Sequence, residues 1–213
     1  MQNLRITEIF YSLQGESRTV GLPTVFVRLT GCPLRCQYCD TEYAFTGGED
    51  YSFEDIFTQI KAYNTPYITV TGGEPLAQKN CIPLLKQLCD DGYRVSLETS
   101  GALSIGQVDP RVNIVMDIKT PASDEADKNL WENLNYLKPD DEIKFVICDH
   151  HDYEWMKTIA DTHDLYQRFN VLLSPVFGEI DIADLAQWTL NDQLNVRLQV
   201  QLHKIIWGEE QGR

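Results

Sequence analysis

The sequence predicts an α/β fold, namely a partial, open (β/α) barrel of about six parallel strands. Three observations lead to this class. Short apolar runs rich in β-branched residues alternate with stretches of helical periodicity. Most of these runs begin 26 to 29 residues after the preceding one, which is about one βα unit and favours a mainly parallel sheet. The chain has 213 residues, whereas a complete eight-fold barrel usually needs about 250.

In chain order, the first strand candidate is 4–11. Seven further apolar runs are strand candidates: 24–29, 67–71, 94–97, 113–116, 142–147, 170–173 and 196–200. Four helices are expected from apolar residues at helical spacing: Phe53, Ile56, Phe57 and Ile60 after a Ser52 cap; Ile82, Leu85 and Leu88 or Cys89; Tyr153, Met156, Ile159 and Ala160; and Ile182, Leu185, Ala186 and Trp188. The interval from 94 to 113 leaves little room for a crossover helix. The sequence does not indicate whether the connector 43–51 contains a helix.

The composition is that of one globular domain over 1–213. Hydrophobic residues make up 43% and charged residues 23%, and a chain of this length buries about 70% of its unfolded surface without disulfides. It has no run of 18 apolar residues and no apolar segment at its start, so we expect no membrane span, no signal peptide and a cytoplasmic location. The net charge of −14 repels a phosphate polyanion and argues against nucleic acid as a partner.

Three of the six cysteines lie within eight residues. Cys32, Cys36 and Cys39 form a CxxxCxxC pattern directly after the strand candidate 24–29, and such folds carry their chemistry at the C-terminal ends of strands. A 4Fe–4S cluster held by three cysteines keeps one iron open to a small molecule. A closed zinc site would need a fourth ligand, and Cys36 with Cys39 alone could form a redox dithiol. The remaining cysteines, expected to be small buried side chains, are Cys81, Cys89 and Cys148.

A glycine-rich turn follows the next strand candidate and consists of Thr71, Gly72, Gly73, Glu74 and Pro75. The glycines let the backbone approach a ligand closely, and the proline ends the strand. By itself, this motif also describes an ordinary tight turn. Because it follows the strand after the cysteine loop, both features are expected at the same edge of the sheet.

Together, the CxxxCxxC pattern and the Gly-Gly-Glu-Pro turn resemble the radical S-adenosylmethionine (SAM) superfamily. The resemblance implies that Cys32, Cys36 and Cys39 hold a 4Fe–4S cluster whose open iron binds the methionine end of SAM. It also implies that one electron from the cluster cleaves SAM to a 5′-deoxyadenosyl radical, which removes hydrogen from a substrate.

Within the superfamily, the chain resembles the 7-carboxy-7-deazaguanine synthases almost end to end. The segments that carry this resemblance are 12–16, Arg28, 39–41, 98–101 and 201–204. It implies a lyase of queuosine and 7-deazapurine biosynthesis that converts 6-carboxy-5,6,7,8-tetrahydropterin to 7-carboxy-7-deazaguanine with loss of ammonia. Hydrogen abstraction at C6 and a Mg²⁺-assisted ring contraction would achieve this, with SAM re-formed. The resemblance further implies a barrel smaller than the usual superfamily core, a flavodoxin or ferredoxin as electron donor, and a homodimer.

The same resemblance assigns roles position by position. Metal ligands would be Cys32, Cys36 and Cys39 for the cluster and Thr41 for Mg²⁺. SAM would be bound by Gly73, Glu74, Ser100, Asp117, Ile118, Lys119, Ser174, Pro175, Val176 and Phe177. The substrate would be bound by Leu13, Gln14, Gly15, Arg28, Thr71 and His203. The N-terminal segment 1–23 would lie on the substrate side, 201–213 would form a C-terminal tail, and no residue is assigned as an acid, base or nucleophile.

The residues themselves leave ordinary alternatives open at several of these positions. A planar guanidinium such as that of Arg28 suits a carboxylate, but an arginine in an acidic chain is also typical of a surface ion pair. Thr41 could cap a turn, since one hydroxyl is a small part of the octahedral oxygen shell that Mg²⁺ prefers. A lone histidine such as His203 is often structural.

Two features depart from the pattern of the resembled family. Ser17 stands where a glycine is usual, and the tail after Trp207 is longer and more acidic. Three other classes make different predictions. A glycyl-radical enzyme activase would release 5′-deoxyadenosine only with a protein partner, a zinc module would be colourless, and an electron carrier would need a fourth cysteine ligand.

Overall fold

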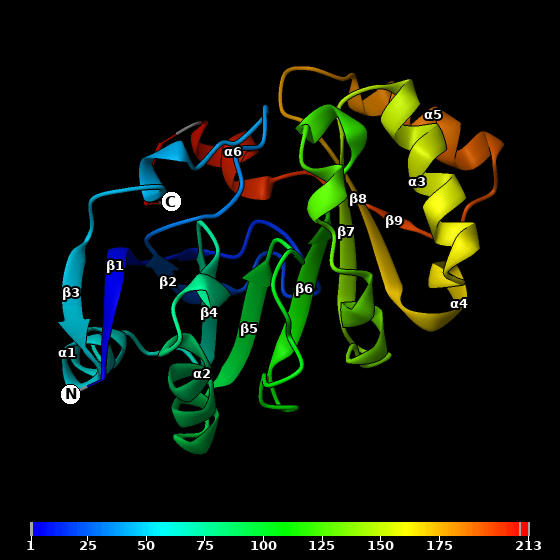
Figure 1. The fold of residues 1–213 in the computed structure, drawn as a ribbon. Helices are drawn as coiled ribbons and strands as arrows, with labels where there is room; N and C mark the ends of the chain where they lie inside the picture. Colours follow the sequence, from blue (N-terminus) through cyan, green and yellow to red (C-terminus); the bar gives the residue numbers. More distant parts are fainter. Residues whose placement is uncertain (1, 209, 213) are drawn as a thin grey trace.

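The structure is a computed structural model that describes residues 2–208 and 210–212, shown in Figure 1. Within these residues, one nine-stranded sheet has the order β3-β1-β2-β4-β5-β6-β7-β8-β9. The strands that run parallel to one another are β2 (Pro23–Leu29), β4 (Tyr67–Gly72), β5 (Arg94–Thr99), β6 (Asn113–Ile118), β7 (Glu142–Ile147), β8 (Asn170–Pro175) and the short β9 (Arg197–Leu198). The strand order ends at β3 and β9, so the barrel is open and mainly parallel, which confirms the predicted fold class.

The N-terminal strand runs against the others. The strand β1 (Asn3–Leu13) pairs antiparallel with β2, and β3 (Glu49–Ser52) pairs antiparallel with β1. The sequence predicted β1 but left the connector 43–51 undecided. This connector contains a 3₁₀ turn, η1 (Glu42–Ala44), and the strand β3, whose residues are all exposed or half-buried. A four-residue exposed edge strand has no apolar alternation, so periodicity does not reveal it.

The helices are α1 (Phe53–Ile60), α2 (Cys81–Asp90), α3 (His150–Thr162), α4 (Leu165–Arg168), α5 (Ile182–Asn191) and α6 (Leu202–Trp207). Helix α1 begins at the predicted cap, where the Ser52 hydroxyl accepts from the Asp55 backbone N–H and the Asp55 carboxylate accepts from the Ser52 N–H. Figure 1 shows α1 and α2 beside the first half of the sheet and α3 to α5 beside β7 to β9. None of the helices formed by the described residues is long and apolar enough to cross a membrane.

The middle of the sheet is covered by turns. As predicted from the short interval, the connection between β5 and β6 consists of bends and turns. The 3₁₀ turns η3 (Pro121–Ser123), η4 (Ala126–Lys128) and η5 (Trp131–Asn135) follow β6. Ile105 and Leu134 from these connections are buried in the main core, so short loops cover β5 and β6 where a longer chain would place helices.

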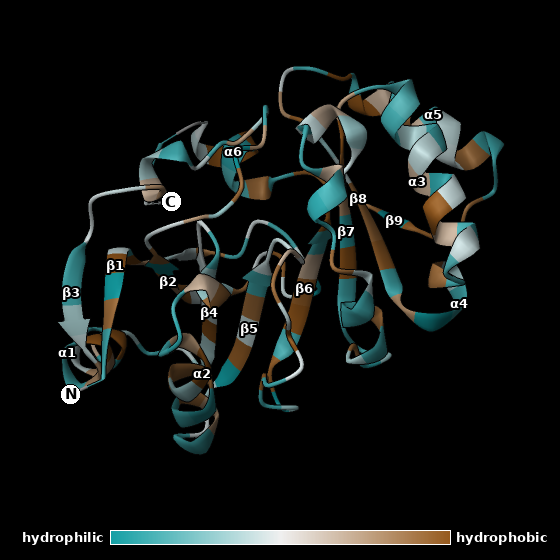
Figure 2. Ribbon diagram, viewed as in Figure 1, coloured by the Kyte–Doolittle hydropathy of each residue, from teal (hydrophilic) through white to brown (hydrophobic). Residues whose placement is uncertain are grey.

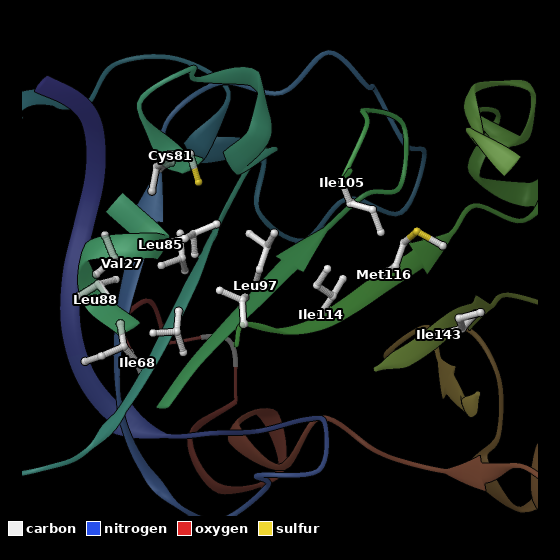
Figure 3. Close-up of a cluster of buried hydrophobic side chains, with 14 of the residues drawn as sticks. Val27, Ile68, Cys81, Leu85, Leu88, Leu97, Ile105, Ile114, Met116 and Ile143 are labelled. Carbon is white, nitrogen blue, oxygen red and sulfur yellow. The ribbon is translucent and has the colours of Figure 1, made fainter. Parts of the chain in front are cut away.

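The two faces of the sheet differ in chemistry. The outer face carries the apolar core, in which Val27, Ile68, Leu97 and Ile114 pack against α2 and the covering loops (Figure 3). Figure 2 shows bands of hydrophobic and hydrophilic residues along the strands. Because successive side chains of a strand point to opposite faces, the polar residues between the apolar ones face the concave side. That concave side holds the candidate site.

Candidate active site

A cavity of about 610 Å³ lies on the concave side of the sheet, at the C-terminal ends of the parallel strands. Its walls come from the ends of β2, β4, β5, β6, β7 and β8, from the segment after β1, and from α6. All of the site residues predicted from the sequence line this cavity, with the exception of Glu74 and Ile118. The fold therefore brings together residues that lie 190 positions apart in the sequence, such as Leu13 and His203.

The cysteine loop forms one wall. Cys32, Cys36 and Cys39 are free, half-buried and directed to the same cavity. The loop is packed against the glycine turn, because a Cβ at Gly73 would lie 2.4 Å from the Gly31 carbonyl oxygen and 2.8 Å from the Cys32 Cβ. Any side chain there would push the turn away from the cysteines, so the glycine permits a close approach of the two motifs.

The three thiols are the donor set that a cluster with one open iron needs. Burial raises the pKa of each of the three thiols, while the nearby Lys119 ammonium acts in the opposite direction. Within the part of the chain that the structure describes, no group of three or more Cys, His, Asp or Glu side chains is arranged to hold one metal ion. A closed zinc site needs four donors around one ion, whereas a cubane binds each cysteine through a different iron.

Glu74 joins the ends of β4 and β5 beneath the cavity. Its fully buried carboxylate accepts hydrogen bonds from the Ser100 N–H at 2.7 Å, the Ser100 hydroxyl at 2.5 Å and the Thr99 hydroxyl at 2.9 Å. Ser100 reaches the cavity lining, and the Glu74 carboxylate does not. The Ile118 side chain belongs to the apolar core. Both predicted SAM contacts thus lie outside the cavity lining, and the Glu74 side chain positions Ser100.

A row of alternating charges crosses the concave face. The Lys119 ammonium lies 2.9 Å from the Asp117 carboxylate, Asp117 lies 3.3 Å from the Lys144 ammonium, and Lys144 lies 2.8 Å from Glu16. The register of β6 and β7 sets Asp117 directly opposite Lys144. Burial alone would raise the pKa of Asp117, but the two ammonium groups together lower it. Lys144 keeps its proton because Asp117, Glu16 and Glu98 raise its pKa against the effect of burial.

A half-buried carboxylate, that of Glu98, lies next to this row. Glu98 accepts a hydrogen bond from the Thr71 hydroxyl at 2.9 Å and one from the Gln14 amide at 3.3 Å. The same Gln14 amide donates to the Thr69 hydroxyl at 3.1 Å. Burial raises the pKa of Glu98, and Lys144 partly opposes this. Glu98 therefore fixes the two polar side chains Gln14 and Thr71, which were both predicted to meet the substrate.

Arg28 is an ion-paired residue within the cavity wall. Its Nε lies 2.7 Å from the Glu8 carboxylate, which also accepts a hydrogen bond from the Tyr43 hydroxyl at 2.9 Å. The Arg28 and Glu8 side chains are only 16% and 22% exposed, so this is not a solvated surface pair. An anionic ligand in the cavity would meet the terminal Nη groups, which suit a planar carboxylate.

The cavity closes where the segment after β1 meets α6. A Cβ at Gly15 would lie 2.0 Å from the His203 Nδ1, so only glycine leaves room for this imidazole. Burial lowers the pKa of His203, which favours the neutral ring. The neighbouring Ser17 has a φ of 65°, in the left-handed region that glycine adopts without strain. The serine at this position thus keeps the glycine conformation at a conformational cost.

The predicted Mg²⁺ ligand Thr41 lies at the cavity edge, and its hydroxyl donates to the Asp40 carboxylate at 2.8 Å. The predicted segment 174–177 begins with the last two residues of β8 and lines the same cavity. It is anchored by the Val176 N–H, which donates to the Ile147 carbonyl at 2.9 Å. Phe177 is 51% exposed and forms part of the rim.

Several cavity residues received no role from the sequence; they are Glu16, Asp40, Glu98, Lys144 and Gln201. All but Lys144 fall in segments that carry the family resemblance, so their position next to predicted residues was the available signal. Lys144 interrupts an apolar run between Ile143 and Phe145. A lysine inside a buried strand requires a charged partner, and that is the signal that sequence reasoning missed.

Comparisons with known proteins agree with this geometry. Residues 26–188 match the model of the radical SAM superfamily. The chain is 43% identical to a 7-carboxy-7-deazaguanine synthase of Koribacter versatilis, with 97% of this chain and 98% of that protein covered. It is 42% identical to a 7-carboxy-7-deazaguanine synthase of Chlorobaculum tepidum, with 97% and 96% covered.

Among solved structures, QueE from Escherichia coli superposes with a TM-score of 0.80 at 25% identity, covering 95% of this chain and 96% of that one. The SAM-bound SuiB of Streptococcus suis superposes with a TM-score of 0.53 at 13% identity, covering 80% of this chain and 45% of that one, which reflects a shared fold.

Proposed function

Because the chain belongs to the radical SAM superfamily and, within it, to the 7-carboxy-7-deazaguanine synthases, we propose that its cavity binds 6-carboxy-5,6,7,8-tetrahydropterin and forms 7-carboxy-7-deazaguanine with loss of ammonia. The protein is a radical SAM lyase of the queuosine pathway that acts on a small molecule, and it uses a 4Fe–4S cluster, SAM and Mg²⁺. The observation that carries the proposal is a single cavity in which the CxxxCxxC loop faces Gln14, Arg28 and Thr71.

Cys32, Cys36 and Cys39 would hold the cluster, and Lys119 would face the carboxylate of SAM. When bound, these cofactors supply a carbon radical that takes hydrogen from C6 of the substrate. The chain contributes orientation and exclusion of water. Gly73 keeps its turn against the cysteine loop, Ser100 is held by Glu74, and residues 174–177 line the far wall.

On the substrate side, the carboxylate at C6 would meet the Nη groups of Arg28, whose Nε is already fixed by Glu8. Gln14 and Thr71, both held by Glu98, would meet the polar edge of the pterin ring. Leu13 and Gly15 would lie along the ring, and the neutral His203 would close the pocket over it. These side chains position the substrate and do not themselves transfer a proton.

Thr41 would bind Mg²⁺ through its hydroxyl oxygen. A neutral hydroxyl that ligates a cation keeps its proton, and that proton needs an acceptor. Asp40 supplies the acceptor at 2.8 Å, which leaves the lone pairs of the Thr41 oxygen for the metal. The remaining ligands would be the substrate and water, because Mg²⁺ retains part of its hydration shell.

The finer assignments are also proposals. One continuous sheet supports a single domain over 1–213, with 1–23 on the substrate side and 201–213 as the tail. A flavodoxin or ferredoxin would supply the electron, since the cluster must be reduced before SAM is cleaved. The homodimer is proposed from the resemblance to the family, and the cytoplasmic location from the apolar pattern of the sequence.

The test is anaerobic reconstitution with iron and sulfide, followed by addition of SAM, Mg²⁺, a reductant and 6-carboxytetrahydropterin. We expect 7-carboxy-7-deazaguanine, detected by mass spectrometry, with little net consumption of SAM. Formation of 5′-deoxyadenosine without this product would refute the substrate and leave the radical SAM chemistry in place. Release of 5′-deoxyadenosine only with a second protein would instead indicate a glycyl-radical enzyme activase.

A further inference from the structure

The C-terminal helix α6 is held on the cavity by polar contacts. None of its six residues, all of which the structure describes, is buried. Ile205 and Ile206 are 61% and 46% exposed, and the apolar side chains of Leu202 and Trp207 are only half-buried, so apolar packing alone does not fix its position. A helix of this length is not stable by itself in water, and its place must therefore come from the side chains and backbone groups that contact the rest of the chain.

On one side, α6 contacts the segment after β1. The Leu202 N–H donates to the Gly15 carbonyl at 3.0 Å, and the His203 ring fills the space that a Gly15 side chain would take. The Gln201 amide, just before the helix, donates to the Glu16 carboxylate at 2.9 Å. This side of α6 thus belongs to the proposed substrate wall.

On the other side, α6 contacts the loop that carries the cysteines. The Lys204 ammonium lies 2.8 Å from the Asp40 carboxylate, and the Gln201 amide is 3.2 Å from the same oxygen. The other Asp40 oxygen accepts from the Thr41 hydroxyl. Figure 1 shows α6 beside the loop between β2 and β3. One carboxylate therefore connects α6 to the side chain proposed to bind Mg²⁺.

Lys204 also contacts the third wall of the cavity. Its ammonium lies 5.4 Å from the centre of the Phe177 ring, within the range of a cation–π contact. The Lys204 side chain is only 10% exposed, although it belongs to a helix with two outward isoleucines. This lysine is thus directed inward, where it meets the cysteine loop and the segment after β8.

We propose that Lys204 is a positioning residue that fastens α6 across the cavity, so that the substrate wall and the Thr41 site for Mg²⁺ form together. The inference rests on the proposed function. With Lys204 paired, Asp40 is held in the orientation in which it accepts the Thr41 proton. Without it, Asp40 keeps only the longer contact from the Gln201 amide at 3.2 Å, so the attachment of α6 to the cysteine loop weakens and the separation of Thr41 and His203 is less well fixed.

The first measurement is hydrogen–deuterium exchange of the protein without cofactors. The variant Lys204→Met should exchange the amides of residues 201–208 faster than wild type, whereas Lys204→Arg, which retains charge and reach, should restore protection. A matched control is Lys86→Met, because Lys86 is also paired with an aspartate but lies on α2, away from the cavity. It should leave exchange of 201–208 unchanged.

The second measurement is the dependence of product formation on Mg²⁺ and substrate concentration. For Lys204→Met, the half-saturating Mg²⁺ concentration and the substrate KM should both rise about tenfold, as for the loss of an outer-shell partner. We expect kcat to change less than about twofold, because the lost contact binds the substrate equally in the ground state and in the transition state. Gly15→Ala should also raise the half-saturating Mg²⁺ concentration. The new methyl group would displace His203, and with it α6, although Asp40 and Thr41 themselves are not substituted.

The outcomes separate this inference from the proposed function. Product formation by wild type, combined with an unchanged Mg²⁺ requirement in Lys204→Met, would overturn the role of Lys204 only. Faster exchange of residues 201–208 in Lys204→Met, combined with an unchanged Mg²⁺ requirement, would show that Lys204 is only a structural contact. This outcome would also overturn the inference. If wild type forms no product, the proposed function fails, and unchanged exchange in Lys204→Met would independently show that this lysine does not hold α6.

Discussion

Neighbouring residues on β5 and β7 face opposite sides of the sheet and meet opposite surroundings. On β5, Leu97 is buried in the apolar core, while Glu98 turns to the cavity and hydrogen-bonds to Thr71. On β7, Phe145 is buried in the same core, while Lys144 pairs with carboxylates across the concave face. Strands of a parallel sheet are usually apolar on both faces. Here the outer face follows that rule, while the concave face mixes charged and polar side chains with apolar ones such as Phe26 and Val146.

The difference indicates a division of roles. The outer face supplies free energy of folding through apolar burial, about 25 cal/mol per Å². The concave face buries charges, which contribute little net stability even when they are paired. Such groups are retained where function needs them. If this is correct, substitutions on the concave face should change chemistry more than stability, with Lys144 as the informative exception, and those on the outer face the reverse.

The largest effect is expected at the rim of the concave face. Cys36→Ala should abolish both iron binding after reconstitution and cleavage of SAM, because two thiolates no longer hold the cluster. Cys148→Ala is the matched control, since Cys148 lines the same cavity outside the CxxxCxxC pattern, and it should retain its iron. Iron analysis and the visible absorbance measure both. A Cys36→Ala protein with full iron content and cleavage would remove Cys36 from the ligand set.

Lys144→Met should affect stability and chemistry together. It leaves Asp117 with Lys119 as its one cation and Glu16 without its ammonium partner, so the cost should approach the roughly 3–5 kcal/mol of unfolding free energy for a broken buried ion pair from below. The disturbed concave face should also release more 5′-deoxyadenosine per molecule of product. The control Lys157→Met breaks an ion pair of a more exposed lysine, where a loss below about 1 kcal/mol is expected. Equal losses in the two variants, measured by urea unfolding, would contradict the importance of the buried row.

Thr41→Ala should affect Mg²⁺ binding without affecting iron binding. Removal of the hydroxyl should raise the Mg²⁺ concentration needed for half-maximal product formation by about 10- to 100-fold and leave the iron content unchanged. Thr41→Ser keeps the hydroxyl and its bond to Asp40 and should stay close to wild type. A Mg²⁺ titration of product formation decides this, and a wild-type response of Thr41→Ala would refute the assignment of Thr41.

The sequence was sufficient for the parts of the molecule with a strong local pattern. The helix after Ser52 and the strand after 66 were predicted because capping and apolar periodicity act within a few residues. The edge strand β3 was not, because it is held by pairing with β1 and has little apolar content. Local patterns describe segments, while pairing partners are fixed only in the fold.

The same distinction applies to the site. Cys36 and Thr41 were predicted from motifs, and the structure brings both to the cavity. Lys144 was not predicted, since its meaning depends on the register that sets it opposite Asp117 on another strand. Glu74 was predicted to contact SAM, which stays a prediction, and the structure shows in addition that its carboxylate fixes Ser100. The sequence motifs therefore predicted which segments reach the cavity. Which side chains of those segments contact one another depends on the pairing of the strands.

On the outer face, Leu97→Ala should reverse the pattern of the cavity variants. Leu97 is fully buried, and its truncation leaves a void that costs about 2–5 kcal/mol of unfolding free energy. The neighbouring Glu98 keeps its hydrogen bonds, so iron content and product formed per folded molecule should match wild type at low temperature. Urea unfolding and the product assay test the two halves. A large loss of specific activity would show that the two faces are not independent.

The smallest effect is expected one residue further along the same strand. Burial raises the pKa of Glu98 above its usual 4.5, so the ionised carboxylate lowers the stability of the folded state near neutral pH. The folded chain then binds more protons at this site than the unfolded chain, and the instability is relieved as pH falls through the folded-state pKa. Asp117, whose pKa is lowered, should do the reverse and lose its stabilising contribution as pH falls.

The variant Glu98→Gln therefore measures how much the charge of Glu98 lowers the stability of the folded state. The amide can accept from Gln14 and, since hydroxyls rotate, donate to Thr71, so both contacts have a replacement. We expect Glu98→Gln to unfold at a slightly higher temperature than wild type at pH 7, with the difference shrinking toward about pH 4.5. Product formation should fall in the same variant, because the Thr71 hydroxyl would accept a hydrogen bond from the new amide where it donates to the carboxylate in wild type. A Glu98→Gln protein that is less stable than wild type at pH 7 would mean that Glu98 is stabilising, and the division between the two faces would fail at the position where it is most sharply drawn.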